Sequence, residues 1–174
     1  MGYNEEKIGG KKMNQYEIRR ADRVDLDRIM EIYDYARAFM VRSGNPTQWR
    51  DGYPGRDILE ADIDKECLFV VTNRDEIRGV FYFVIGDDPT YGYMENGCWR
   101  SDDPYGTIHR VAGDGSGGIF AACLKFCKGQ ISHIRIDTHR DNKPMQYVLE
   151  KHGFSPRGII YVGDGTARIA YDSL

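Results

Sequence analysis

The run GTIHRVAGDGSGGIFAACLKFCKGQISHIRIDT, residues 106–138, decides the fold of this chain. A strand-like segment, Gly106–Ala112, leads into a glycine cluster, Gly113–Gly118, in which four of six residues are glycine. An apolar helical stretch follows over about 117–128, and a second strand-like segment covers Ser132–Thr138. Main-chain amides in a glycine loop at a helix start suit a phosphate or pyrophosphate. A tight turn without a ligand explains the cluster equally well at this point.

Outward from this unit, apolar periodicity and turn residues predict the other elements. They are a strand at 15–21, a helix capped by Asp22 and running to about 40, a helix at 56–65, a hairpin of 67–72 with 77–85, a helix from Asn142 to about 152, and a hairpin of 158–162 with 167–171. We expect one mixed α+β domain over residues 14–174, built on a largely antiparallel sheet, after a flexible tail of residues 1–13.

Composition narrows the class of protein. The chain has 174 residues and a net charge of −3, from 24 basic and 27 acidic side chains. That balance argues against a nucleic-acid or membrane-surface partner, both of which require a basic field. Its four cysteines form no C-x-x-C pair, and Cys123 and Cys127 lie one helical turn apart. We therefore expect core thiols in a reducing cytoplasm and no metal site.

Three consecutive motifs carry a resemblance to a known family. They read GIFAACLKFC from Gly118, HIRIDTHRDN from His133, and KPMQYVLEKHGF from Lys143. Together with the element order from about residue 15 to 171, they resemble the GNAT superfamily of acetyl-CoA-dependent N-acetyltransferases. The resemblance implies a three-layer fold whose twisted, largely antiparallel sheet contains a splayed parallel pair. It also implies acetyl-CoA as cosubstrate, and a homodimer is compatible with it.

The resemblance places the coenzyme A pyrophosphate on the glycine loop. Two registers of the family motif fit, Arg110–Gly115 by its letters and Gly115–Phe120 by its place at the helix start, and we prefer the second. It lacks the family's leading Arg or Gln, and Asp114 adds a negative charge near the expected anion. The contacts implied are main-chain amides of Val111, Gly113, Gly115, Ser116, Gly117 and Gly118. The Val111 amide is also expected to hold the thioester carbonyl oxygen.

The last helix carries a second set of family positions. By resemblance, Asn142 contacts the pantetheine arm, and a plain helix N-cap is an equal and compatible role. The family often has a tyrosine four residues before the glycine of this motif, as general acid for the leaving thiolate. Here that position is Leu149, and Tyr147 lies about 200° around the helix from it, so it should not substitute. The sequence leaves the general acid unassigned.

Transfer to an amine requires its free base, so a group that accepts a proton is expected near the acetyl group. His109 is the candidate, on the strand that lines the acetyl group in the family. A hydrogen-bonded strand histidine without a catalytic role is the alternative. Strand alternation places Arg135 and Asp137 on one polar face, where we expect an ion pair of Asp137 with Arg135 or Arg110.

Aromatic residues gather in the two long irregular segments, 47–55 and 86–105. An acceptor pocket lined by Trp49, Tyr53, Trp99 and Tyr105 is expected, with ordinary loop anchoring as the alternative. The acids of the second segment, Glu95, Asp102 and Asp103, are expected to be solvated.

The sequence thus predicts an N-acetyltransferase that moves an acetyl group from acetyl-CoA to a primary amine of a small molecule or amino-acid derivative. The amine would attack the thioester directly. A noncatalytic acyl-CoA-binding or sensing module of the same fold is the alternative, motivated by Leu149 at the usual tyrosine position.

Overall fold

The computed structural model describes residues 16–174, and the predicted tail of residues 1–13 lies outside them. The helices and strands follow the predicted order. The strands are β1 (Glu17–Arg20), β2 (Leu68–Asn73), β3 (Glu76–Ile85), β4 (Gly106–Gly113), β5 (Ile134–Thr138), β6 (Ser155–Tyr161) and β7 (Ala167–Ser173). The helices are α1 (Leu26–Arg42), α2 (Arg56–Asp64), α3 (Ile119–Lys128) and α4 (Lys143–Lys151), with 3-10 turns η1 (Arg23–Asp25) and η2 (Pro89–Tyr91).

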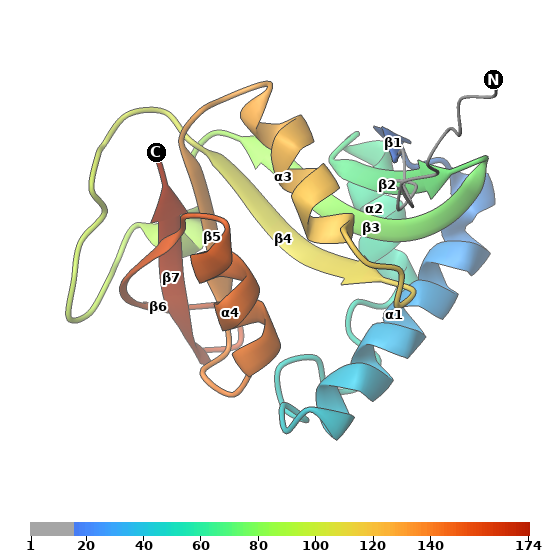
Figure 1. Cartoon of the computed structure of the whole chain (residues 1–174). Helices are drawn as coiled ribbons and strands as arrows, with labels where there is room; N and C mark the ends of the chain where they lie inside the picture. The colour runs from blue at the N-terminus through green and yellow to red at the C-terminus, as the bar shows by residue number, and fades with distance from the viewer. Residues whose placement is uncertain (1–15) are drawn as a thin grey trace, which may run out of the picture.

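The seven strands form one mixed sheet in the order β1-β2-β3-β4-β5-β7-β6. All neighbouring pairs are antiparallel except β4 and β5, which run parallel. This parallel pairing extends only from Gly106 and Ile134 to Ile108 and Ile136, although β4 continues to Gly113. Figure 1 shows β4 and β5 diverging beyond that point. The predicted splayed pair is therefore present.

Helices cover both faces of the sheet, which gives the three layers (Figure 1). Helices α1 and α2 pack on one face through a core that includes Ile29, Tyr33, Leu59 and Val80. Helices α3 and α4 cover the other face through a second core. Strand residues alternate between these two cores, because successive side chains of a strand point to opposite faces.

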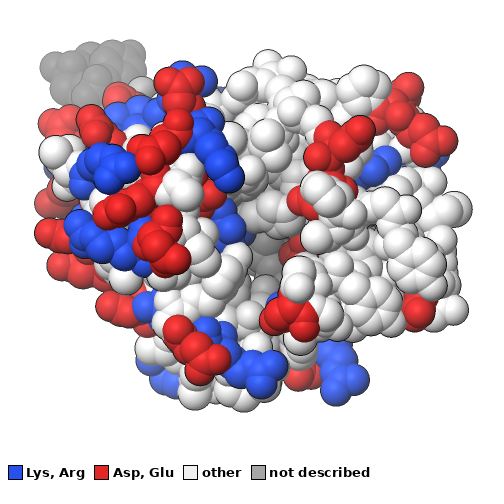
Figure 2. Space-filling model, turned by 180° about the vertical axis from the view of Figure 1, so that it is seen from behind, with Lys and Arg blue, Asp and Glu red and all other residues white. Residues whose placement is uncertain are grey.

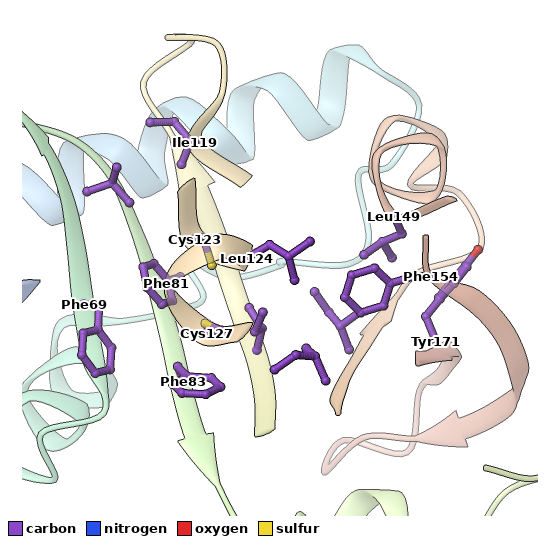
Figure 3. Packing of buried hydrophobic residues seen from close by; sticks show 14 residues of the cluster. Phe69, Phe81, Phe83, Ile119, Cys123, Leu124, Cys127, Leu149, Phe154 and Tyr171 are labelled. Atoms are coloured by element: carbon purple, nitrogen blue, oxygen red, sulfur yellow. The ribbon is translucent and has the colours of Figure 1, made fainter. Parts of the chain in front are cut away.

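The core under α3 and α4 contains both cysteines of α3. Figure 3 shows Cys123 and Cys127 on the inner side of that helix, with Phe81 and Phe83 of β3 nearby. Both are free thiols with 0% exposure, so the predicted packing role is confirmed.

The segment between β3 and β4 covers part of the sheet on the α1–α2 face. Its Tyr91 and Tyr105 pack with Ile160 of β6 and Ala170 of β7. Main-chain hydrogen bonds of 2.8 and 2.9 Å join Glu95 to Ile159. The approach is so close that a Cβ on Gly97 would lie 1.6 Å from the carbonyl oxygen of Arg157, so only glycine fits there. Glu95 is not simply solvated, because its carboxylate also accepts a 2.8 Å bond from the Tyr161 hydroxyl.

Within residues 16–174, no helix combines the length and the apolar character needed to cross a membrane.

Candidate functional site

A cavity of about 790 Å³ opens where β4 and β5 separate. Its walls include the segment joining α1 to α2 with the start of α2, the start of the β3–β4 segment, strands β4 and β5, helix α4, and the β6–β7 hairpin. Figure 2, viewed from the side opposite Figure 1, shows the surface hollowed between a half rich in charged side chains and a largely uncharged half. Because Met145 of α4 belongs to one core and Trp49 to the other, the cavity has walls on both faces of the sheet.

Strand β4 contains a bulge at the edge of this cavity. Tyr82 pairs with His109 and Val80 with Ala112, so Arg110 and Val111 both stand opposite Phe81. Arg110 has a φ of 53°, in the left-handed region. A bulge with an extra residue bends a strand and re-aims its groups, and this one begins two residues beyond Ile108, the last β4 residue that pairs with β5. Val111, expected to supply a main-chain amide, lies at this bend and lines the cavity.

His109 lies between two carboxylates on the cavity wall. Its Nε2 is 2.8 Å from Oδ2 of Asp88, and its Nδ1 is 3.5 Å from Oδ2 of Asp137. The hydroxyl of Tyr91 donates to the same Asp137 oxygen at 2.9 Å. Asp137 is therefore held in place by a buried phenol, and the imidazole is held in place by Asp88.

Asp88 is itself fixed by its surroundings. Its Oδ1 accepts hydrogen bonds from the amide and hydroxyl of Thr90, at 2.8 and 2.7 Å. Its own amide donates to the hydroxyl of Tyr105 at 2.9 Å. Burial by itself would raise the pKa of Asp88, but the hydrogen bonds from His109 and Thr90 outweigh burial and lower it to about 2. The residue is a carboxylate throughout the physiological range.

The predicted ion pair of Asp137 with Arg135 or Arg110 is wrong. Arg110 instead pairs with Asp62 of α2, and its Nη1 donates to the Tyr53 hydroxyl at 3.1 Å. The prediction depended on the alternation of β5, which does not determine the direction of Arg110 on β4, and Arg110 lies in the bulge of that strand. Burial raises the pKa of Asp62, and the adjacent guanidinium opposes this rise.

Arg135 makes no pair with Asp137 either. Its guanidinium lies 3.8 Å from the ring centre of Tyr105 and 4.2 Å from that of Trp99, and it donates to the Ser101 carbonyl at 2.8 Å. At Arg135 the polar face of β5 is thus stabilised by cation–π contacts and a hydrogen bond instead of an ion pair.

The four aromatic residues expected in the acceptor pocket divide into two pairs. Trp49 and Tyr53 line the cavity, whereas Trp99 and Tyr105 are not among its lining residues. Trp99 donates through Nε1 to the Tyr91 carbonyl at 3.0 Å, and Tyr105 holds Asp88. Trp99 and Tyr105 therefore hold Tyr91 and Asp88 in place, and these two residues contact Asp137 and His109. The expected role of Trp99 and Tyr105 as pocket walls is not what the structure shows, because the 86–105 segment packs on the sheet.

The glycine loop lies between the end of β4 and the start of α3, where the preferred register Gly115–Phe120 places it. Gly118 is the N-cap of α3 with a φ of 86°, and a Cβ on Gly117 would meet no atom within 4 Å. At Gly117 the loop therefore presents open main chain beside a helix N-terminus, as an anion requires, whereas a Cβ on Gly115 would lie 2.6 Å from the hydroxyl of Tyr35. Two loop amides are already used within the protein: that of Asp114 donates to the Arg78 carbonyl at 2.9 Å, and that of Ser116 donates to the Asp114 carboxylate at 3.0 Å.

The expected conflict between Asp114 and a bound anion is reduced by two arginines. Arg78 and Arg28 contact Oδ2 of Asp114 at 3.2 and 3.3 Å. Burial opposes ionisation of Asp114, but hydrogen bonds from Ser116 and Arg78 lower its pKa overall. The negative charge of Asp114 is therefore compensated by Arg78 of β3 and Arg28 of α1.

Asn142 and Leu149 of the last helix have distinct roles. Asn142 caps α4 by accepting from the Met145 amide at 3.2 Å, and its Nδ2 donates to Gln48 at 2.9 Å. It also lines the cavity. Leu149 is 0% exposed in the core, while Tyr147 is 67% exposed and does not line the cavity. The geometry agrees with the expectation that neither replaces the family's tyrosine.

Sequence reasoning missed Asp88 and Gln48. Asp88 lies 21 residues from His109, and only its position before Pro89 marked it, as the start of a turn. Gln48 accepts from both Asn45 and Asn142 and joins the first irregular segment to α4. No periodicity links these positions. Residues 16–174 hold no group of three or more His, Cys, Asp or Glu side chains arranged for a metal ion.

Several solved structures share the fold of this chain. No protein-family model matches the chain, and no curated protein matches it. An acetyltransferase of the GNAT family from Streptococcus agalactiae 2603 is similar at 28% identity and a TM-score of 0.82, over 91% of this chain and 95% of that one.

Two further solved structures share the fold at lower identity. A GNAT-family acetyltransferase from Listeria monocytogenes 4b F2365 has 18% identity and a TM-score of 0.65, over 91% of this chain and 94% of the other. An N-acetyltransferase from Staphylococcus aureus Mu50 has 18% identity and a TM-score of 0.58, over 92% and 98%.

Proposed function

Because this chain belongs by fold to the GNAT superfamily of acetyltransferases, we propose that it transfers an acetyl group from acetyl-CoA to a primary amine of a small molecule. The observation that carries the proposal is the position of His109. It directly follows Ile108, the last residue of β4 that pairs with β5, and it lines the cavity opened by the splay.

Two features of the chain fit acetyl-CoA. Residues 109–113 of β4 have no partner on β5, so main-chain groups along this edge are available to the amides of a pantetheine arm, except the Arg110 carbonyl, which accepts from the Tyr33 hydroxyl at 2.9 Å. The open glycines before α3 offer amides and a helix N-terminus for the pyrophosphate, chiefly Gly117 and Gly118. When bound, acetyl-CoA supplies the thioester that the amine attacks directly, with Val111 at the bulge as donor to the carbonyl oxygen.

His109 and its two carboxylates perform the proton transfer in this proposal. In this proposal the Asp88 carboxylate accepts a hydrogen bond from Nε2–H of His109, which keeps the proton on Nε2 and leaves Nδ1 as an acceptor. Asp137 lies 3.5 Å from Nδ1 and attracts the substrate ammonium to the same place. The ammonium gives its proton to Nδ1 and becomes the nucleophile.

The last helix supplies no acid for the leaving thiolate, since Leu149 is buried and Tyr147 lies outside the cavity. Solvent in the open cavity is the proton source that we assign.

A reducing cytoplasm is the proposed location, because the thiols in residues 16–174 are free.

The test is incubation of the purified protein with acetyl-CoA and a panel of primary amines, with thiol release as readout and calorimetry for coenzyme A binding. Amine-dependent thiol release supports the proposal. Tight coenzyme A binding without release for any amine would favour a noncatalytic sensing module, and no coenzyme A binding would contradict both functions.

A further inference from the structure

Arg168 is a buried cation in the cavity wall. It lies on β7 with 7% of its surface exposed, and it lines the cavity. Its Nη1 donates to the hydroxyl of Thr166 at 2.7 Å and to the carbonyl of Ala167 at 3.1 Å. Within residues 16–174 no carboxylate oxygen comes within 4.0 Å of it, and no hydrogen bond uses its Nε or Nη2.

Two other arginines near the cavity differ from it. Arg110 is paired with Asp62, and Arg135 is stacked on two aromatic rings. A buried charge without a partner is costly and is usually compensated. Arg168 therefore leaves one edge of its guanidinium, Nε and Nη2, available to a ligand in the cavity.

The charges around Arg168 make this end of the cavity positive. Arg50 lines the same cavity, and Asp164 on the β6–β7 turn is the nearby acid. Both Asp164 contacts, to the amide and hydroxyl of Thr166, use its Oδ1. Burial first, and then Arg168 with Arg140 and Arg50, lower the pKa of His139, against the opposing effect of Asp141.

Arg168 stands close to the groups that handle the amine. Asp137 of β5 pairs with Ala170 of β7, and Arg168 is two residues along on the same face. Such diagonal neighbours on a sheet are about 7–8 Å apart. Asp137 in turn contacts His109. The cavity thus has an anionic position for an ammonium and, beside it, a cationic position.

We propose that the acceptor amine also carries a carboxylate, and that Arg168 binds this carboxylate through Nε and Nη2. The inference rests on the proposed acetyltransferase function and names its substrate class. Two parallel N–H groups match the two oxygens of a carboxylate, which makes the contact selective as well as favourable. An amino acid satisfies both positions, whereas its decarboxylated amine satisfies only the one at Asp137.

Matched pairs of acceptors test this directly. L-phenylalanine with 2-phenylethylamine, and L-methionine with 3-(methylthio)propylamine, differ only in the carboxylate. For the wild-type protein kcat/KM should be about 10- to 100-fold higher for the amino acid. Arg168→Gln should remove this preference, chiefly by raising KM for the amino acid. For the decarboxylated amines, kcat/KM of this variant should stay within about threefold of the wild-type value.

Two variants control for other effects. Arg42→Gln removes an exposed arginine at the end of α1 that does not line the cavity, and it should change kcat/KM of either acceptor by less than about threefold. Arg168→Lys keeps the positive charge but cannot make the bidentate contact, so it should retain part of the preference for the amino acid. Thermal melting and coenzyme A affinity show whether each variant is folded.

Equilibrium binding separates this inference from the proposed function. With coenzyme A present, calorimetry should show L-phenylalanine binding to the wild-type protein about 10-fold or more tightly than to Arg168→Gln. That result supports the carboxylate site even if no amine is acetylated. Equal affinities, or acetylation of both members of each pair at equal rates by the wild-type protein, would overturn it.

Discussion

Nε2 of His109 lies 2.8 Å from Oδ2 of Asp88, and this contact ties strand β4 to the segment that follows β3. The same segment returns through Tyr105, whose hydroxyl holds the Asp88 main chain. A catalytic imidazole is effective only when its tautomer and its direction are fixed. Here both are fixed by residues that lie outside the strand of the histidine.

Replacing either partner should lower the rate of acetyl transfer. His109→Gln should reduce kcat by about 10²- to 10⁴-fold, because the amine then loses its proton acceptor. Asp88→Asn should reduce kcat less, and the double variant should be no worse than His109→Gln alone, since Asp88 acts through the imidazole. Steady-state kinetics at saturating acetyl-CoA measure this. Asp87→Asn, an exposed neighbour, is the matched control, and a kcat of His109→Gln equal to wild type would refute the assignment.

Asp88 should make stability depend on pH in the acid range. Its pKa is lowered to about 2 in the folded protein, against a usual value of 3.8. The carboxylate therefore stabilises the fold above about pH 4, and this contribution, about 2 kcal/mol, is lost as pH falls through about 2. Urea unfolding at pH 7 and pH 2 should show the wild-type advantage over Asp88→Asn shrinking by that amount. An advantage independent of pH would show that Asp88 has an ordinary pKa.

A charge at the N-cap of α3 should abolish coenzyme A binding. Gly118 has a φ of 86°, and only Tyr16 lies near its Cβ position, at 3.5 Å. Gly118→Glu places a carboxylate where the pyrophosphate is expected, and affinity should fall by at least about 100-fold. Gly118→Asn is the control, because asparagine tolerates this φ and carries no charge. Calorimetry with coenzyme A compares the two, and equal losses would point to backbone strain as the cause.

Leu149 should contribute to stability, and Tyr147 should contribute to neither stability nor catalysis. Leu149→Ala should cost about 2–5 kcal/mol of unfolding free energy, because Leu149 is 0% exposed in the core. Tyr147→Phe removes only an exposed hydroxyl and should leave kcat within about twofold and stability within about 0.5 kcal/mol. Denaturation and steady-state kinetics measure both. A large loss of kcat in Tyr147→Phe would identify it as the missing acid.

The sequence predicted the elements well where local chemistry determines them. Asp22 caps the first turn before α1, and Asn142 caps α4, as expected from their side chains. The glycine loop before α3 was also predictable, because the left-handed conformation of Gly118 is a local requirement that glycine meets.

The sequence failed at the partner of Asp137. Period-two alternation placed Arg135 and Asp137 on one face of β5, and Arg110 was the other expected partner, but Arg135 stacks on aromatic rings and Arg110, in the bulge of β4, pairs with Asp62 of α2. A bulge has no composition that a single sequence shows, and its position depends on both neighbouring strands.

By itself, the sequence determined the order of helices and strands, the glycine loop at the start of α3, and His109 as the titratable group on the central strand. These follow from periodicity, capping and backbone freedom, which act over a few residues. Only the tertiary structure decided what surrounds that histidine: Asp88 from one loop, Asp137 from the next strand, and Arg168 from β7. Such contacts join residues far apart in the chain, and their energies depend on burial and distance, which exist only after the sheet has formed.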